Sequence, residues 1–322
     1  MIDKDTPGGY GPSDLQTAYN LTPYSKNNGS GITVAIVDAY DDPNAASDLA
    51  VYRAQYGLAK CAPSNGCFTK VKMGSRTNAG WASEESLDVD MVSAICPNCK
   101  ILLVEAASAT IGSLTSAEKY ATAHANYVSN SWSGNEGGTK SYDKYYGVSG
   151  VAITAATGDF GYNPTAQWPA ILPSVTGVGG TTLLSTSPRV ESAWSGAGSG
   201  CSKIYPTPNF QKTINTGCTK RAQADSSADA DPYTGVAVYD TFHYGGWLVF
   251  GGTSVATPIT ASVFALAGNT ASNNNGYLYA HASSLNDVTT GSNGSCGPPL
   301  CVAGTGWDGP TGLGTPNGIG AF

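Results

Sequence analysis

The stretch GITVAIVDAY, residues 31–40, is a short run of apolar and β-branched residues that contains one carboxylate near its end. A run of this length and composition is typical of a strand that is buried on both faces of a sheet. Similar runs follow in KILLVEA (100–106), GVAITAATGD (150–159) and SVTGVGGTTLL (174–184), and helix-like stretches such as 115–126 lie between the earlier ones. Buried strands that alternate with helices predict an α/β fold, a mostly parallel sheet flanked by helices.

The composition describes a globular protein with few ionised groups. The chain has 322 residues, of which 41% are hydrophobic and 12% charged, and its net charge is −7. This length allows one large domain or two ordinary ones, with ample apolar material for a core. The negative net charge argues against a nucleic-acid partner. No run of about 18 apolar residues occurs, so we expect no membrane span.

Eight cysteines form four close pairs along the chain: Cys61 with Cys67, Cys96 with Cys99, Cys201 with Cys218, and Cys296 with Cys301. An even number of clustered cysteines indicates local disulfides and an oxidising compartment, although about 105 connectivities are formally open. The spacing of Cys96 and Cys99 also suits a zinc knuckle or a redox motif, but no second close Cys or His pair accompanies it. We therefore expect four local disulfides in a secreted protein, with zinc as the weaker alternative.

The start of the chain, MIDKDTPGGYGPSDL, carries no signal-peptide pattern. Together with the secreted type of cysteine pattern, it is typical of a mature segment to which a start methionine has been added. We expect the natural precursor to carry a segment ahead of it.

One serine stands at a turn in GGTSVATP, residues 251–258, after the strand-like GWLVF and before a helix-like stretch at 256–267. Ser254 could cap the helix, because serine is a preferred N-cap residue. It could equally be a nucleophile, since a strand–turn–helix that exposes a serine at its turn is a recurrent way to present one. A nucleophile needs a base and oxyanion donors from elsewhere in the chain.

The segment WASEESLDVDMVSAIC, residues 81–96, contains four acids. As acids at a helix N-terminus they would interact favourably with the helix dipole, which is the structural explanation. At about 100° per residue, Glu84 and Asp88 fall on the apolar face, Asp90 points to the polar side, and Glu85 lies at the margin. Two carboxylates one turn apart on an apolar face are costly unless they share a proton. Such a pair can act as a base with a tuned pKa.

Histidine is the usual base for a serine nucleophile, but the three histidines lie in unfavourable contexts. His124 falls within a helix-like stretch, and His243 and His281 lie in segments rich in Tyr and Ser. We expect each to be a surface or packing residue. A carboxylate is therefore the better candidate for the base of Ser254.

In these residues the chain resembles the sedolisins, the serine-carboxyl peptidases, which combine a subtilisin-like fold with a Ser-Glu-Asp triad. The family's Glu-x-x-x-Asp element matches Glu84 and Asp88, and its Gly-Thr-Ser turn matches Ser254. Its Gly-Asp element after a strand matches Asp159 in TAATGDFGY. Further matches are GYGPSDLQTAYNL, NSWSG, PAILPSVTGVGGTTL, ADPYTG, DVTTGSNG and GTGWDGPTGLGTPNG. The resemblance implies that residues 1–322 form a single large catalytic domain with a subtilisin-like α/β fold.

Two positions depart from the family pattern. Phe160 follows Asp159 where a serine is common, and Val255 follows Ser254 where alanine is common. Phe160 could alter the pocket near the oxyanion, and with it the substrate preference. Ordinary subtilisins keep a triad aspartate at the strand end that Asp38 occupies, but their histidine segment is missing here. We therefore expect Asp38 to be structural, as a turn cap or as a partner of the catalytic groups.

The resemblance implies an acid-acting endopeptidase that hydrolyses protein or peptide substrates through an acyl-enzyme. Ser254 would be the nucleophile, Glu84 its base and Asp88 the partner that orients the base. Asp159, when protonated, would stabilise the oxyanion together with the Ser254 N–H. The substrate backbone would pair with the extended segment formed by Ser131, Trp132, Ser133 and Gly134.

The resemblance also implies one Ca²⁺ ion near the C-terminus. Its ligands would be the Asp287 and Asp308 carboxylates and the carbonyls of Val288, Gly304 and Gly306. The structural alternative is a glycine-rich loop that only turns. A secreted monomer is expected, with an N-terminal prosegment in its precursor and no nucleic-acid or membrane partner.

Two other functions compete with peptidase activity. The first is a catalytically inactive secreted binding protein on the same fold, since fold does not guarantee function. The second, a glycosidase, is disfavoured because Glu84 and Asp88, one helical turn apart, cannot flank a sugar from two sides.

Overall fold

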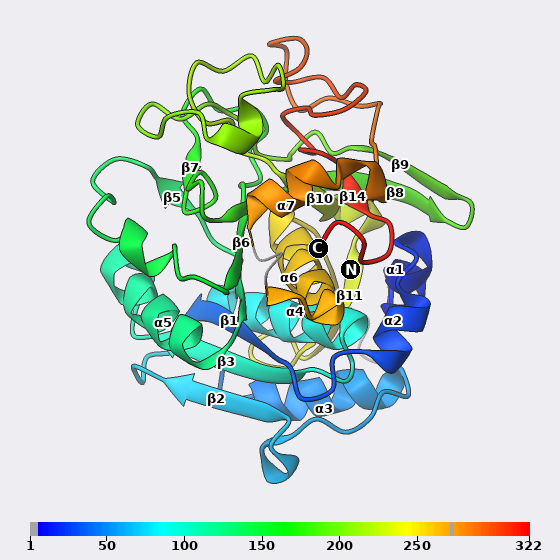
Figure 1. Ribbon diagram of the computed structural model, residues 1–322. Coiled ribbons are helices and arrows are strands. Elements are labelled where there is room, and N and C mark those ends of the chain that lie inside the picture. Colours follow the sequence, from blue (N-terminus) through cyan, green and yellow to red (C-terminus); the bar gives the residue numbers. More distant parts are fainter. Residues whose placement is uncertain (1–5, 271–273) are drawn as a thin grey trace.

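The computed structural model describes residues 6–270 and 274–322, and a parallel sheet runs through its centre (Figure 1). The strand order is β10-β8-β6-β4-β1-β3-β2, and β9 pairs antiparallel with β8 at Thr181–Thr186. The strands are β1 Thr33–Ala39, β2 Phe68–Lys72, β3 Lys100–Ala106, β4 Tyr127–Asn130, β6 Ala152–Ala156, β8 Thr176–Thr186, β9 Arg189–Ala193 and β10 Ser226–Asp229. The predicted α/β fold with a mostly parallel sheet is confirmed.

The four apolar runs of the sequence form β1, β3, β6 and β8, and the other four strands of the sheet, β2, β4, β9 and β10, were not predicted. Of these, β4 and β10 are four residues long, and β10, with the sequence SSAD, has no large apolar side chain. The strand β10 forms because its partner β8 supplies the pairing that its own composition does not indicate.

Helices cover both faces of the sheet. Helix α5 packs on β1, β3 and β4, while α4 and α6 pack against each other and cover the opposite face (Figure 1). Alternate residues of β1 accordingly belong to two hydrophobic clusters, with Val34 and Ile36 on the α4 side and Ala35 and Val37 on the α5 side. The helices are α1 Pro12–Ala18, α2 Thr22–Asn27, α3 Ala45–Gln55, α4 Ala79–Ile95, α5 Ile111–His124, α6 Thr253–Ala267 and α7 Asn275–Ala280.

Helix α4 carries the acid-rich segment and is buried on almost all sides. It contacts β1 and β3 together with α1, α3, α6 and β11 (Val236–Asp240), so it has no continuous solvent face. The prediction that Asp90 points to a polar side is wrong, since Asp90 is 1% exposed and accepts a hydrogen bond from the Tyr239 N–H at 3.0 Å. Glu85, expected at the margin, is 0% exposed. The wheel argument assumed a surface helix, and packing from several elements removed that surface.

The strand predicted ahead of Ser254 exists as β12, Gly246–Phe250, but it does not belong to the parallel sheet. It pairs antiparallel with β11 in a separate two-stranded sheet. The chain then turns at Gly252, which has a φ of 106°, and helix α6 begins at Thr253. Ser254 therefore lies in the first turn of a helix that is buried along most of its length.

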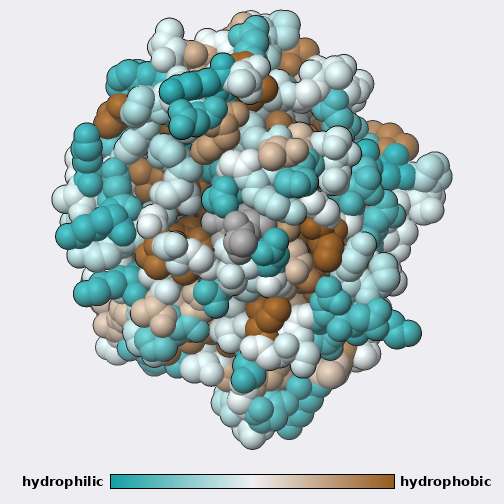
Figure 2. All heavy atoms as spheres, viewed as in Figure 1, coloured by the Kyte–Doolittle hydropathy of each residue, from teal (hydrophilic) through white to brown (hydrophobic). Residues whose placement is uncertain are grey.

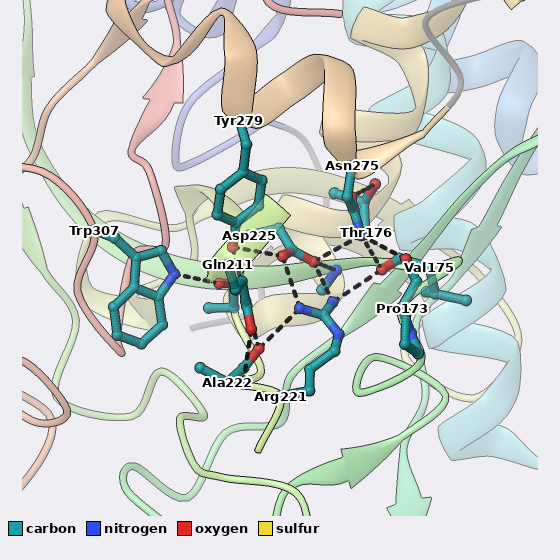
Figure 3. Close-up of polar contacts among 12 residues, drawn as sticks. Pro173, Val175, Thr176, Gln211, Arg221, Ala222, Asp225, Asn275, Tyr279 and Trp307 are labelled. Atoms are coloured by element: carbon teal, nitrogen blue, oxygen red, sulfur yellow. Dashed lines mark hydrogen bonds and ion pairs between the residues drawn. The ribbon is translucent and has the colours of Figure 1, made fainter. Parts of the chain in front are cut away.

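A buried polar network ties α7 to the start of β8 and β10 (Figure 3). At its centre the Arg221 guanidinium pairs with the Asp225 carboxylate at 2.6 Å, and both side chains are fully buried. Asp225 also accepts hydrogen bonds from Tyr279 Oη at 2.9 Å and from Asn275 Nδ2 at 3.2 Å. The Asp225 carboxylate thus has several donors, while the Arg221 Nε has no partner among the described residues. Either charge alone would be costly to bury.

All four predicted disulfides are present: Cys61–Cys67, Cys96–Cys99, Cys201–Cys218 and Cys296–Cys301. This pairing excludes the zinc alternative at Cys96 and Cys99. The remaining elements are short: strands β5 Gly134–Asn135, β7 Gln167–Trp168, β13 Leu285–Asn286 and β14 Thr315–Pro316, and 3-10 helices at Pro63–Asn65, Asp143–Tyr145, Asn209–Gln211, Pro232–Thr234 and Ala282–Ser284.

The visible face of the molecule mixes hydrophobic and hydrophilic residues without one continuous apolar area (Figure 2). Within residues 6–270 and 274–322, none of the helices has the length and the apolar character that crossing a bilayer requires.

Candidate functional site

The candidate site forms where the first turn of α6 meets α4. The Ser254 hydroxyl has two acceptors within reach, the Ser131 carbonyl at 3.3 Å and the Glu84 carboxylate. Gly252, and not Ser254, occupies the N-cap position of α6. The interpretation of Ser254 as a helix cap is therefore wrong, and its half-buried hydroxyl is directed at a potential base.

Ser131 links Asp88 to the serine. The Asp88 carboxylate is fully buried and accepts a hydrogen bond from Ser131 Oγ at 2.7 Å. The same Oγ lies 3.2 Å from the carbonyl oxygen of Ser254. Glu84 and Asp88 are in electrostatic contact, as expected for residues one turn apart on a helix. The structure thus brings together three of the four residues that the sequence pointed to.

Burial keeps protons on both carboxyl groups of this pair. It raises the pKa of Glu84 to about 7, an effect that the Ser254 hydrogen bond opposes and the charge of Asp159 reinforces. Burial, followed by the charges of Asp38 and Glu84, raises the pKa of Asp88 well above its usual range. A carboxyl group with a pKa near neutrality, in contact with a serine hydroxyl, is suited to general acid–base work.

Asp38 lies beside this pair, at the carboxyl end of β1. It is 0% exposed, and neither of its oxygens has a hydrogen-bond partner among the described residues. Burial and the charge of Glu84 raise its pKa well above the usual range. The expectation of a turn cap is wrong, because a capping carboxylate would accept backbone N–H bonds; Asp38 is instead an electrostatic neighbour of the catalytic candidates.

Asp159 contacts Thr253, the residue that precedes the serine. Its Oδ1 accepts hydrogen bonds from the Thr253 N–H at 2.7 Å and from Thr253 Oγ1 at 2.8 Å, while the residue as a whole is exposed. A Cβ atom at Gly252 would come within 2.8 Å of Asp159 Oδ2, so the glycine leaves room for this carboxyl group. The Ser254 N–H, in the first helical turn, has no intrahelical acceptor and is available to a ligand.

Two cavities border residues of the candidate site. One, of about 360 Å³, is lined by Asn78, Gly80, Trp81, Glu84, Ser131 and Trp132. The other, of about 160 Å³, lies on the Asp159 side and is lined by Ser133, Asn135, Thr157, Gly158, Phe160, Gly161, Asn163, Gln167, Gly198, Ser199 and Gln223. The lining of the second cavity contains no charged side chain. The departure Phe160 lies on its rim with 95% of its side chain exposed, as the sequence suggested.

The segment from Ser131 to Gly134 follows directly on β4. Ser133 lines one cavity, and Ser131 and Trp132 line the other. Trp132 is mostly buried and donates its Nε1–H to the Val37 carbonyl at 3.1 Å, while Gly134 pairs with Trp168 in β7. The segment is therefore anchored at both ends and borders both cavities.

Sequence reasoning missed several contributors to this site. Thr253 holds Asp159, Ser131 joins Asp88 to Ser254, and Trp81 lines the larger cavity. Only Trp81 carried a signal, since it lies one turn ahead of Glu84. The histidines lie elsewhere: the rings of His124 and His281 bond to backbone carbonyls of their own helical turns, at Tyr120 and Tyr277.

The predicted calcium ligands come together in one loop. Asp287 Oδ2 accepts a hydrogen bond from the Gly306 N–H at 2.9 Å, and Asp308 Oδ2 accepts one from the Gly304 N–H at 3.2 Å. Burial raises the pKa of Asp308 to about 7, and the charge of Asp287 adds to this. Within residues 6–270 and 274–322, no three His, Cys, Asp or Glu residues are grouped to hold a metal. Two carboxylates close together without a cation fit a hard ion completed by backbone carbonyls, such as that of the buried Val288.

Comparison with known proteins identifies the relatives of this chain. No family model matches it. It is 29% identical to kumamolisin of Bacillus sp. (strain MN-32), over 97% of this chain and 63% of kumamolisin. It is 35% identical to sedolisin of Pseudomonas sp. (strain 101), over 47% of this chain and 29% of that protein. The chain thus spans less than two thirds of the length of these relatives.

A solved structure extends the likeness to the whole fold. Pseudomonas sedolisin, a serine-carboxyl proteinase determined with two molecules of pseudo-iodotyrostatin, superposes with a TM-score of 0.81 at 25% identity. The match covers 97% of this chain and 96% of that one. Two relatives in sequence and one solved structure thus agree in supporting the sedolisin family for this chain.

Proposed function

We propose that the protein is a serine-carboxyl endopeptidase that hydrolyses peptide bonds of proteins in acid solution. The observation that carries the proposal is the contact of the Ser254 hydroxyl with the Glu84 carboxylate, with Asp88 one turn further along the same helix. Residues 1–322 would form one catalytic domain. The other members of the site support this function through their positions around the serine.

In the first step Ser254 Oγ attacks the scissile carbonyl carbon and Glu84 accepts the hydroxyl proton. Glu84 then gives that proton to the leaving amine, and an acyl-enzyme remains. In the second step Glu84 takes a proton from the attacking water and returns it to Ser254. Asp88, itself held by Ser131 Oγ at 2.7 Å, shares a proton with Glu84 and orients it.

The oxyanion would lie between the Ser254 N–H and the Asp159 carboxyl group. The two bonds from Thr253 hold Oδ1 of Asp159, so Oδ2 is the oxygen that can carry a proton towards the substrate. A carboxyl group donates a hydrogen bond only when it is neutral. An ionised Asp159 would instead repel the developing negative charge.

Two opposite protonation requirements follow. The rate rises with pH as Glu84 ionises, and it falls as Asp159 ionises, so kcat/KM against pH should be bell-shaped. Because burial raises the pKa of Glu84 to about 7, only part of the molecules hold an ionised base in acid solution. The requirement for a neutral Asp159 restricts activity to acid despite this loss.

The substrate would lie along Ser131–Gly134, with alternate side chains on opposite sides of the strand. The two cavities that border this segment, one at Ser133 and the other at Ser131 and Trp132, support this placement. Protein or peptide chains are the expected substrates.

We also infer one bound Ca²⁺. Asp287, Asp308 and the carbonyls of Val288, Gly304 and Gly306 would hold it, and the meeting of the two carboxylates with Gly304 and Gly306 in one loop supports this. Its role would be to stabilise the C-terminal loop. The four disulfides support a secreted monomer made with a prosegment.

Cleavage of a denatured protein substrate from about pH 3 to about pH 8 tests the proposal. We expect acid-optimal cleavage that Ser254→Ala and Glu84→Gln abolish. Matched controls are Ser262→Ala, a buried serine further along α6, and Glu118→Gln, a buried glutamate in α5; both should retain activity. Absence of cleavage by the folded, calcium-supplied parent would favour the inactive binding protein. Activity that rises steadily to neutral pH would contradict the role of Asp159.

A further inference from the structure

Two more buried carboxyl groups lie next to Asp38 and the catalytic candidates, and the mechanism above does not use them. In the parallel pairing of β1 with β3, Asp38 is the register partner of Glu105, so both side chains leave the same face of the sheet at its carboxyl end. Glu85 reaches this place from α4. Glu85 is 0% exposed and Glu105 is 1% exposed.

The hydrogen bonds of Glu105 are unevenly divided between its two oxygens. Oε1 accepts from the Asp42 N–H at 3.1 Å and lies 3.1 Å from the Lys70 ammonium. Oε2 has no hydrogen-bond donor among the described residues. The remaining partner of Glu105 is the carboxyl group of Glu85. Glu85 in turn has no conventional donor at either oxygen among the described residues.

Two carboxyl groups can bond to each other only when one of them holds a proton. The Lys70 ammonium and the Asp42 N–H stabilise negative charge on Glu105, so the proton belongs to Glu85. The pair then carries one proton and one negative charge, and this charge lies beside Asp38.

We propose that Glu85 and Glu105 share one proton as a second carboxyl pair, and that the charge of this pair keeps Asp38 protonated and so sets the pH at which Glu84 ionises. The pair would thus be a positioning element for the base. The second half of this inference rests on the proposed peptidase function.

The surroundings of the pair agree with this assignment. Burial, then the charges of Asp38 and Glu105, raises the pKa of Glu85 well above the usual range, while Lys70 and Glu85 limit the rise for Glu105. The titratable groups that face the pair are Asp38 on β1, Asp42 after it, Lys70 on β2, and Glu84 and Asp88 on α4. Lys70 is also paired with Asp41 at 2.7 Å, so it remains in place when Glu105 is neutralised.

Two variants separate the proton from the charge. Glu85→Gln removes the shared proton but leaves the charge on Glu105. The double variant Glu85→Gln/Glu105→Gln also removes the charge and keeps the size and the hydrogen-bonding groups of both side chains. Glu118→Gln serves as the control, because it removes a buried carboxyl group on the other face of the sheet.

The first measurement is the infrared carbonyl band of protonated carboxyl groups, taken in the Ser254→Ala background at about pH 5. We expect Glu85→Gln to lose the intensity of one protonated carboxyl group that exchanges with deuterium slowly. An unchanged band would contradict the proposal that Glu85 and Glu105 share a proton. This measurement needs no peptidase activity, so it tests the shared proton independently of the proposed function. It uses only the single variant, so it remains a test if the double variant does not fold.

The second measurement is kcat/KM against pH. We expect the ascending limb of Glu85→Gln and of Glu118→Gln to coincide with that of the parent. In the double variant Asp38 loses the charge that keeps it protonated and ionises beside Glu84, so the limb should move to higher pH by about one unit. A limb that does not move, or that moves equally in the single variant, would overturn the link to Glu84.

Discussion

Glu118 shows in one residue how this fold depends on acid solution. Its side chain is 0% exposed in α5 and faces no cation, and burial raises its pKa to about 8 from an ordinary value of 4.5, with the Asn130 amide opposing the rise. Below about pH 4.5 the group is protonated in both the folded and the unfolded chain, so its titration does not lower the free energy of unfolding. Above that pH the Glu118 carboxyl group ionises in the unfolded chain before it ionises in the folded one, and this ionisation stabilises the unfolded chain.

The magnitude follows from the shift. A difference of 3.5 pKa units, 8 minus 4.5, corresponds to about 5 kcal/mol at about 1.4 kcal/mol per unit. This stability is present in acid, is lost progressively as the pH rises from about 4.5 to about 8, and is not lost further above that. Glu118→Gln removes the titration, and its amide can donate to Asn130 Oδ1, which lacks a partner in the described structure.

We expect Glu118→Gln to leave stability in acid nearly unchanged and to stabilise the protein by several kcal/mol near about pH 8, relative to the parent at the same pH. Urea unfolding of Ser254→Ala and Ser254→Ala/Glu118→Gln measures this without self-digestion. A free-energy difference between the two proteins that is the same at about pH 4 and about pH 8 would refute the reasoning.

Three other changes test separate parts of the molecule. Asp159→Asn keeps a hydrogen-bond donor at every pH, so the descending limb of kcat/KM against pH should disappear. Asp159→Ala removes the donor and should lower the rate by about 10² to 10³ at all pH values. A descending limb like that of the parent in the Asn variant would assign that limb to another group. Removal of Ca²⁺ with a chelator should lower the melting temperature of the parent but not of Asp308→Asn, and an unchanged parent melt would argue against the ion. Arg221→Met leaves Asp225 buried without its counter-charge and should destabilise the fold by about 3–5 kcal/mol in denaturant unfolding, with a loss under about 1 kcal/mol contradicting the network in Figure 3.

The strands that build the sheet were predictable where their own residues are apolar. The runs at β1, β3, β6 and β8 need burial on both faces, and only a sheet covered by helices provides it. The strand β10 was not predictable, because small polar residues become a strand only beside a partner. The close spacing of the cysteines likewise identified all four disulfides, since short loops leave few other partners within reach.

By itself the sequence determined the type of fold and predicted both the resemblance to the sedolisins and the catalytic candidates Ser254, Glu84, Asp88 and Asp159, because these depend on local patterns and on short motifs in a fixed order. Only the tertiary structure decided what surrounds them. Glu85 and Asp90 were misjudged from the sequence, and the two alternatives for Asp38 stayed open, since burial of a helix on all sides and contact between β1, β3 and α4 depend on residues far apart in the chain. Protonation follows from those long-range contacts, and so the pH at which this site can work is a property of the folded molecule.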